Sequence, residues 1–121
     1  MDNSPIYLDT LQEEKYLLPV EIAFNRRLCE LIEFIDSYDL NYEEIGVFGS
    51  YARGQYKANS DIDICVIGEQ PERGILADIR CGAEERKADV VFVSREYFEH
   101  SDALMAKNIR RDFRRVRKCK E

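Results

Sequence analysis

The sequence predicts an α/β (α+β) domain in which a small mixed β-sheet is flanked by helices. The first observation behind this class is the order of patterns along the chain, which runs helix, strand, short helix, strand, helix, strand, helix. The second is size, because 121 residues of which 45% are apolar can bury one modest core. Since no repeat or linker divides the chain, we expect residues 1–121 to form a single domain.

Helical periodicity marks both ends of this domain. A first helix is expected over about residues 20–37 and a last, basic helix over about 101–119, starting near Ser101. The apolar stripe of the first helix consists of Phe24, Leu28, Leu31 and Ile35. The stripe of the last consists of Met105, Ile109, Phe113 and Val116.

Three apolar runs between these helices predict strands, at residues 45–48, 62–67 and 87–93. Gly54 is expected to end a short helix after the first strand, and residues 55–60 then form a loop. A further helix opens at Pro71 and ends at Gly82.

The turn after the first strand has the composition of a phosphate-binding turn. Gly49 and Ser50 stand where a strand ends and a helix begins, and there the backbone N–H groups lack intrahelical partners. Gly49 has no Cβ to keep a phosphate from the backbone, and Ser50 offers a helix cap and a hydroxyl donor.

A pair of carboxylates opens the second strand. Asp61 and Asp63 are two residues apart, so both project to one face while Ile62 and Ile64 enter the core. Two hard oxygen ligands on one rigid face suit Mg²⁺.

Together these motifs resemble the minimal nucleotidyltransferases of the DNA polymerase β superfamily, whose signature is Gly-Ser, ten residues, then Asp-x-Asp. Here Gly49-Ser50 precede Asp61-Ile62-Asp63 by the ten residues 51–60, and the superfamily's Ala-Arg-Gly stands at 52–54. Asp89 supplies the third carboxylate at the start of a later strand. The core of the resemblance covers residues 45–93, and it extends more loosely to Arg117.

The resemblance implies a polymerase β-like fold and nucleotidyl transfer from a nucleoside triphosphate, with ATP as the common donor. Asp61, Asp63 and Asp89 would be the catalytic and metal-binding residues for two Mg²⁺ ions, with Mn²⁺ as an alternative. The nucleotide contacts are expected at Gly49, Ser50, Arg53 and Ser60. For Arg53, a solvated helix arginine remains the alternative.

Charge and composition narrow the partners. Residues 107–121 carry eight Lys or Arg and two acids, a net charge of +6. Residues 1–106 must therefore carry a net charge of −12 to give the total of −6. An acidic body repels nucleic acid, so no nucleic-acid template is expected. The basic C-terminal segment is either a contact for RNA, phosphate or an acidic partner, or a solvated cluster.

Other residue types indicate a protein of the cytoplasm. The chain has no run of about 18 apolar residues and no basic and apolar leader, so a cytoplasmic location without membrane contact is expected. The four cysteines, Cys29, Cys65, Cys81 and Cys119, are widely separated and are expected to be reduced thiols. His100 is expected on the surface, without a zinc or general-base role.

The acceptor half of the site is expected to come from outside this chain, because nearly all of its residues form the nucleotide half. In the resembling family, stand-alone domains of this size are commonly antitoxins paired with a small helical HEPN-type ribonuclease, and can transfer AMP to a tyrosine of that partner. Two alternatives stay open: transfer to a small molecule, as in aminoglycoside-modifying relatives, and a binding-only module. Three crowded carboxylates disfavour the second.

Overall fold

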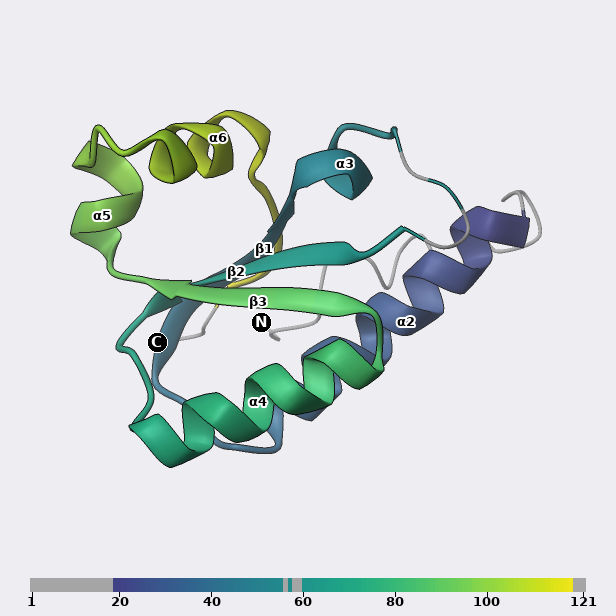
Figure 1. Cartoon of the computed structure of the whole chain (residues 1–121), viewed down its shortest axis with the longest axis horizontal. Helices are drawn as coiled ribbons and strands as arrows, with labels where there is room; N and C mark the ends of the chain where they lie inside the picture. The colour runs from purple at the N-terminus through teal and green to yellow at the C-terminus, as the bar shows by residue number, and fades with distance from the viewer. Residues whose placement is uncertain (1–18, 56, 58–59, 119–121) are drawn as a thin grey trace.

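The computed structural model describes residues 19–55, 57 and 60–118 (Figure 1). The elements follow in the order α2 (Pro19–Asp36), β1 (Tyr42–Phe48), α3 (Gly49–Ala52), β2 (Ile62–Gly68), α4 (Arg73–Glu85), β3 (Ala88–Val93), α5 (Arg95–His100), α6 (Leu104–Asp112) and β4 (Arg114–Lys118). Cys119, expected to be a reduced thiol, and the side chain of Phe24, expected on the apolar stripe, lie outside the described residues.

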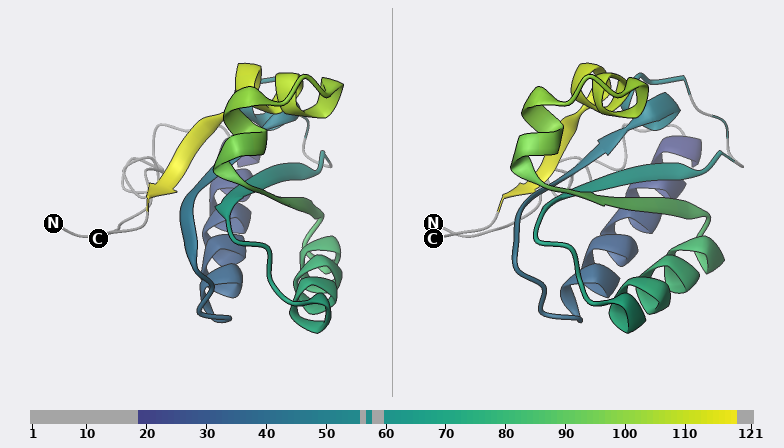
Figure 2. Two further views of the ribbon diagram at one scale, coloured as in Figure 1. Left: turned by 90° about the vertical axis from the view of Figure 1, so that its left-hand side faces the viewer. Right: turned by 60° about the vertical axis from the view of Figure 1, so that its left-hand side comes forward.

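The described strands form one mixed sheet in the order β3-β2-β1-β4. β1 runs antiparallel to both β2 and β4, whereas β2 and β3 are parallel and are joined through α4. Helices α2 and α4 cover one face, and α3, α5 and α6 lie on the other (Figures 1 and 2). The predicted fold class is therefore confirmed.

The alternation of side chains along β2 builds a core on each face. Ile62, Ile64 and Val66 pack toward α2 and α4, where the α2 side chains Leu28, Leu31, Ile32 and Ile35 are buried. Cys65 and Ile67 pack toward the other face with Ile109 of α6, beside Phe98 and Phe113. Asp63 is two residues before Cys65 and four before Ile67 in the same strand, so its side chain lies on the α5 and α6 face with theirs.

The predicted end of α4 at Gly82 is wrong, because the helix continues to Glu85. A Cβ at position 82 would overlap the ring of Phe34 on α2. Gly82 is thus a close-packing residue between two helices and not a helix terminator.

The predicted C-terminal helix over residues 101–119 is also wrong. Residues 104–112 are helical, Phe113 leaves the helix with ψ of 127°, and residues 114–118 form β4 beside β1. Phe113 fits here because Gly46 of β1 has no Cβ, which would overlap its ring. Val116 is buried as expected, but it lies in a strand instead of a helix. Met105, expected on the buried stripe, is 46% exposed.

A short helix was missed before this segment. Ser94 caps α5, its Oγ accepting the Tyr97 N–H at 3.0 Å. The expected helix start near Ser101 is wrong, since Ser101 follows α5 and α6 begins at Leu104. Among the described residues, no helix combines the length and apolar character needed to cross a bilayer.

Candidate active site

The turn from β1 into α3 begins with Gly49 in the left-handed conformation, at φ of 75°. A Cβ at this position would overlap Oδ2 of Asp63, which faces the turn from the adjacent strand, where Phe48 and Asp63 are paired in register. Gly49 is thus required both by its backbone conformation and by the carboxylate against it. From the sequence, only the approach of a phosphate predicts glycine at this position.

Ser50 lies within α3, whose N-cap is Phe48, so the predicted capping role of Ser50 is wrong. Gly54 ends the helix as expected: it has φ of 75°, and the N–H groups of Gly54 and Gln55 bond to the carbonyls of Tyr51 and Ser50. This pattern is a Schellman ending.

The structure brings Asp61, Asp63 and Asp89 to one end of the sheet. Asp63 and Asp89 are in register on the parallel strands β2 and β3, so their side chains project to the same face. Asp61, two residues before Asp63, precedes β2. Asp63 is half-buried, whereas Asp61 and Asp89 are exposed.

The electrostatics of Asp63 reflect this arrangement. Burial, followed by the charges of Asp89 and Asp61, raises the pKa of Asp63 to about 6, and the charge of Arg53 partly opposes the rise. A cation between the carboxylates would relieve the repulsion, and carboxylate oxygens suit Mg²⁺.

Within the part of the chain that the structure describes, no three His, Cys, Asp or Glu side chains are gathered as a ready chelate. The carboxylates are near enough to interact, but a metal here needs additional oxygen ligands. In two-metal sites the phosphate oxygens of the substrate and water supply them. The donor set therefore fits Mg²⁺ bound together with a nucleotide better than Mg²⁺ bound alone.

Arg53 joins α3 to the end of α6. Its Nη1 donates to Oδ2 of Asp112 at 2.7 Å, and Asp112 has a side chain only 5% exposed. Hydrogen bonds from Arg111 and then from Arg53 lower the pKa of Asp112 to about 2. Arg53 is exposed but held in an ion pair with Asp112, and its charge acts on Asp63. Sequence reasoning missed Asp112 because its role depends on the α6 packing.

A second arginine, Arg27 of α2, ties together the starts of β2 and β3. Its Nη2 donates to the carbonyls of Ser60 at 3.2 Å, Arg86 at 3.4 Å and Lys87 at 2.7 Å. Lys87 has an unusual positive φ of 59°, and its carbonyl also accepts from the Ile62 N–H at 3.1 Å. These bonds hold the backbone directly before Asp61 and before the Ala88-Asp89 pair. The only sequence signal for Arg27 is a cation beside the apolar stripe of its helix.

Ser60 has a local structural role in addition to any nucleotide contact. Its Oγ accepts from the Lys57 N–H at 2.8 Å and closes a turn before Asp61. Of the residues not assigned to the site, His100 is exposed, as expected. Cys29, Cys65 and Cys81 are not joined in disulfides within the described residues.

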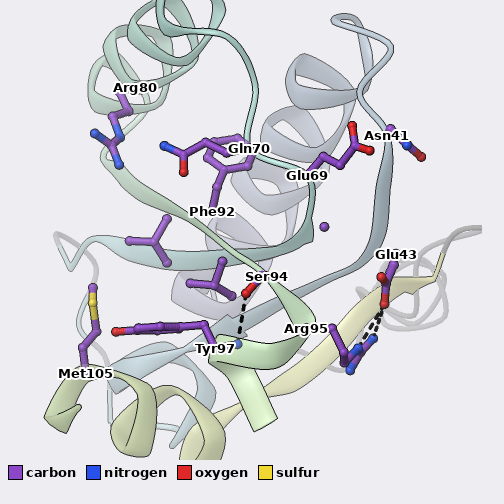
Figure 3. A pocket seen from close by; sticks show the side chains of 13 residues that line it. Asn41, Glu43, Glu69, Gln70, Arg80, Phe92, Ser94, Arg95, Tyr97 and Met105 are labelled. Carbon is purple, nitrogen blue, oxygen red and sulfur yellow. Dashed lines mark hydrogen bonds and ion pairs between the residues drawn. The ribbon is translucent and has the colours of Figure 1, made fainter. Parts of the chain in front are cut away.

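Two cavities border β3. The smaller, about 350 Å³, contains Asp61 and Asp89 together with Arg80 and Glu84 of α4. The larger, about 780 Å³, is lined by residues at the other end of β3 and does not include the carboxylates (Figure 3). The charge arrangement, and not cavity size, therefore locates the candidate active site.

The sequence matches the family model of the nucleotidyltransferase domain over residues 28–118. The chain belongs to this family. The resemblance to nucleotidyltransferases is thus confirmed, and the matched range includes Gly49, the three aspartates and β4. No curated protein matches the chain at a significant level.

Solved structures share the fold. A toxin-antitoxin crystallised with AMP-PNP is 19% identical, with a TM-score of 0.52, and the match covers 78% of this chain and 73% of that one. A mutant of the toxin-antitoxin MntA-HpeT is 18% identical, with a TM-score of 0.53 and coverage of 75% and 73%. A Sulfolobus solfataricus protein with a suggested nucleotidyltransferase assignment is 24% identical, with a TM-score of 0.46 and coverage of 74% and 76%.

Proposed function

We propose that this nucleotidyltransferase domain moves AMP from ATP to a hydroxyl acceptor, with two Mg²⁺ ions held by Asp61, Asp63 and Asp89. The observation that carries the proposal is the position of Asp63, which lies against the Gly49 turn and in register with Asp89. The bound metal would neutralise charge on the triphosphate and on the attacking oxygen. Mn²⁺ has the same ligand preference and is expected to substitute.

The protein residues position the reacting groups. The turn at Gly49 and Ser50 holds the β- and γ-phosphates, so that pyrophosphate leaves in line with attack on the α-phosphorus. Arg53, oriented by Asp112, places positive charge beside Asp63 and the leaving group. Ser60 completes the nucleotide contacts from the turn before Asp61. Asp89 accepts the proton of the attacking hydroxyl.

For the acceptor we propose a tyrosine of a small helical toxin of the HEPN type, which would make this chain a cytoplasmic antitoxin. Support comes from the fold shared with the toxin-antitoxin structures, one of them solved with an ATP analogue. The −12 charge of residues 1–106 would complement a basic ribonuclease. Residues 1–121 would act as one catalytic domain.

The deciding experiment is co-expression with the neighbouring reading frame, followed by intact-mass spectrometry of both proteins. The partner should gain the mass of one or more AMP groups, and Asp61→Asn and Asp63→Asn should each remove the gain. If the partner stays unmodified and a small hydroxylated metabolite is nucleotidylated in an unbiased screen, the small-molecule transferase replaces this proposal.

A further inference from the structure

A trough follows the outer side of β3 along the whole strand. Residues 91–93 line the larger of the two cavities, residues 88–90 include the β3 lining of the smaller, and Arg80 lines both. The cavities are therefore neighbours that meet at Arg80. The smaller one ends the trough at Asp61 and Asp89.

The trough has two walls. Gln70 and Arg80 border it on the side of α4, and Tyr97 and Met105 border it on the side of α5 and α6 (Figure 3). The β3 side chains between the walls are apolar and half-buried from Val91 to Val93. Met105 and its neighbour Leu104 are 46% and 74% exposed. This combination of exposed apolar side chains beside a half-buried apolar strand is typical of a binding surface.

The backbone of β3 is accessible from the trough at Phe92. β3 is an outer strand of the sheet that the described residues form. Because the Ile62 N–H bonds to the Lys87 carbonyl, the parallel ladder directs the N–H and C=O groups of Val90 and Phe92 away from β2. Val90 is only 2% exposed, so the half-buried Phe92 offers the accessible pair of groups. Within the described residues, no hydrogen bond to these outward groups is found. An apolar strand with an open edge is a template for a further strand.

We propose that the trough binds the acceptor as an extended polypeptide segment, which pairs with β3 at Phe92 and brings a side-chain hydroxyl to Asp89. The inference rests on the proposed function of the three aspartates. It deepens that function by naming how the acceptor is recognised: main-chain bonds to β3 give affinity, and the side pockets give selectivity. A small-molecule acceptor would fill only the end beside Asp89.

Charge favours a foreign segment over a second copy of this chain. The acids that line the two cavities outnumber the arginines, and one of the two arginines, Arg95, is already bound to Glu43, Glu44 and Glu99. A second copy would bring the same acidic walls against these, whereas a neutral or basic segment would be complementary.

The test compares Phe92→Pro with Phe92→Ala in the co-expressed pair. Both variants lose the same aromatic packing, but only proline removes the outward N–H, at a position where an edge strand tolerates it. We expect Phe92→Pro to modify the partner about tenfold less efficiently than Phe92→Ala, because an acceptor carbonyl loses its donor. The rise in melting temperature with Mg²⁺ and ATP, which reports the nucleotide half, should be the same in both.

Amide hydrogen exchange of the wild-type complex covers the case in which Phe92→Pro does not fold. The amide of Phe92 should exchange more slowly in the complex than in the free domain. Equal modification by both variants, unchanged exchange at the Phe92 amide, or protection of this amide in a homodimer would each overturn the inference while leaving the transferase intact. If the wild type modifies no protein at all, the proposed acceptor fails, and this inference fails with it.

Discussion

Gly49 and Gly54 both have φ of 75°, yet their surroundings differ. A Cβ at Gly49 would overlap the carboxylate of Asp63, whereas a Cβ at Gly54 would meet nothing within 4 Å. The same backbone strain therefore occurs once beside the proposed site and once away from it. Substituting each glycine in turn therefore distinguishes the effect of backbone strain from the effect of displacing the Asp63 carboxylate.

Gly49→Ala and Gly54→Ala should each lower the free energy of unfolding by about 1–2 kcal/mol, because alanine is strained in this conformation. Only Gly49→Ala should also weaken Mg²⁺-dependent ATP binding, since its methyl group must push Asp63 aside. Denaturant unfolding and calorimetry with ATP measure the two effects. Equal ATP affinity in the two variants would show that Asp63 does not depend on the Gly49 turn.

Asp63 itself combines a cost in stability with a role in the reaction. Its folded pKa of about 6 lies above the ordinary aspartate value of 3.8, so the folded state binds the proton more tightly than the unfolded state. Stability of the metal-free protein should therefore fall as the pH rises from about 4 to about 6, and stay low above this window.

Asp63→Asn should remove this cost, so the metal-free variant should melt at or above the wild-type temperature at pH 7.5, with the difference vanishing below about pH 4. Transfer should fall by about a hundredfold or more, because an amide cannot supply the metal with charge. Melting curves across pH and a pyrophosphate-release assay check both parts. Wild-type release by a well-folded variant would contradict the assignment of Asp63.

At the scale of elements, the site depends on the junctions before β2 and β3. Arg27 reaches three carbonyls there from α2, on the opposite face of the sheet from Asp63. Arg86 lies at the same junction, but its side chain bonds to the Gly82 carbonyl and stacks on Phe34. The two arginines thus share a location and differ in whether they bond to the starts of the strands.

Arg27→Ala should reduce the rate of transfer by about tenfold and lower the free energy of unfolding by about 1–3 kcal/mol, because it leaves the Lys87 and Ser60 carbonyls less satisfied. Arg86→Ala is the matched control and should cost stability without a comparable loss of rate. The readouts are steady-state kinetics at several Mg²⁺ concentrations and denaturant unfolding. Equal rates in the two variants would reduce Arg27 to a structural residue.

At the scale of the whole molecule, two layers of helices enclose the sheet while three acidic side chains remain crowded at one end of it (Figure 2). The repulsion among these carboxylates disfavours the metal-free folded state. Any ligand that neutralises them in the folded state alone stabilises the protein by mass action.

Millimolar Mg²⁺ with ATP should therefore raise the melting temperature by several degrees, whereas either alone should have a smaller effect, since neither supplies all the ligands. Chelation by EDTA should reverse the shift, and the double variant Asp61→Asn, Asp63→Asn should show none. A melting curve that Mg²⁺ and ATP together leave unchanged would contradict the proposed site.

The sequence by itself determined the central helix-strand pattern and the spacing of Gly49, Asp61, Asp63 and Asp89. These features follow from local signals: apolar periodicity, a glycine after a strand, and carboxylates two residues apart. Their period and spacing survive in the folded chain, where Ile62 and Ile64 are buried as expected.

Only the tertiary structure decided what depends on contacts between distant segments. The C-terminal residues 114–118 carry one apolar residue among basic ones, so no local pattern marks them as a strand, and the open side of β1 decides their conformation. Gly82 lies inside a helix because the ring of Phe34 occupies the space that a Cβ would need. Arg53 gains its role from Asp112. Arg27 gains its role from the Ser60 and Lys87 carbonyls. Each of these residues acts through partners far along the chain, and spacing within a local window carries no information about them.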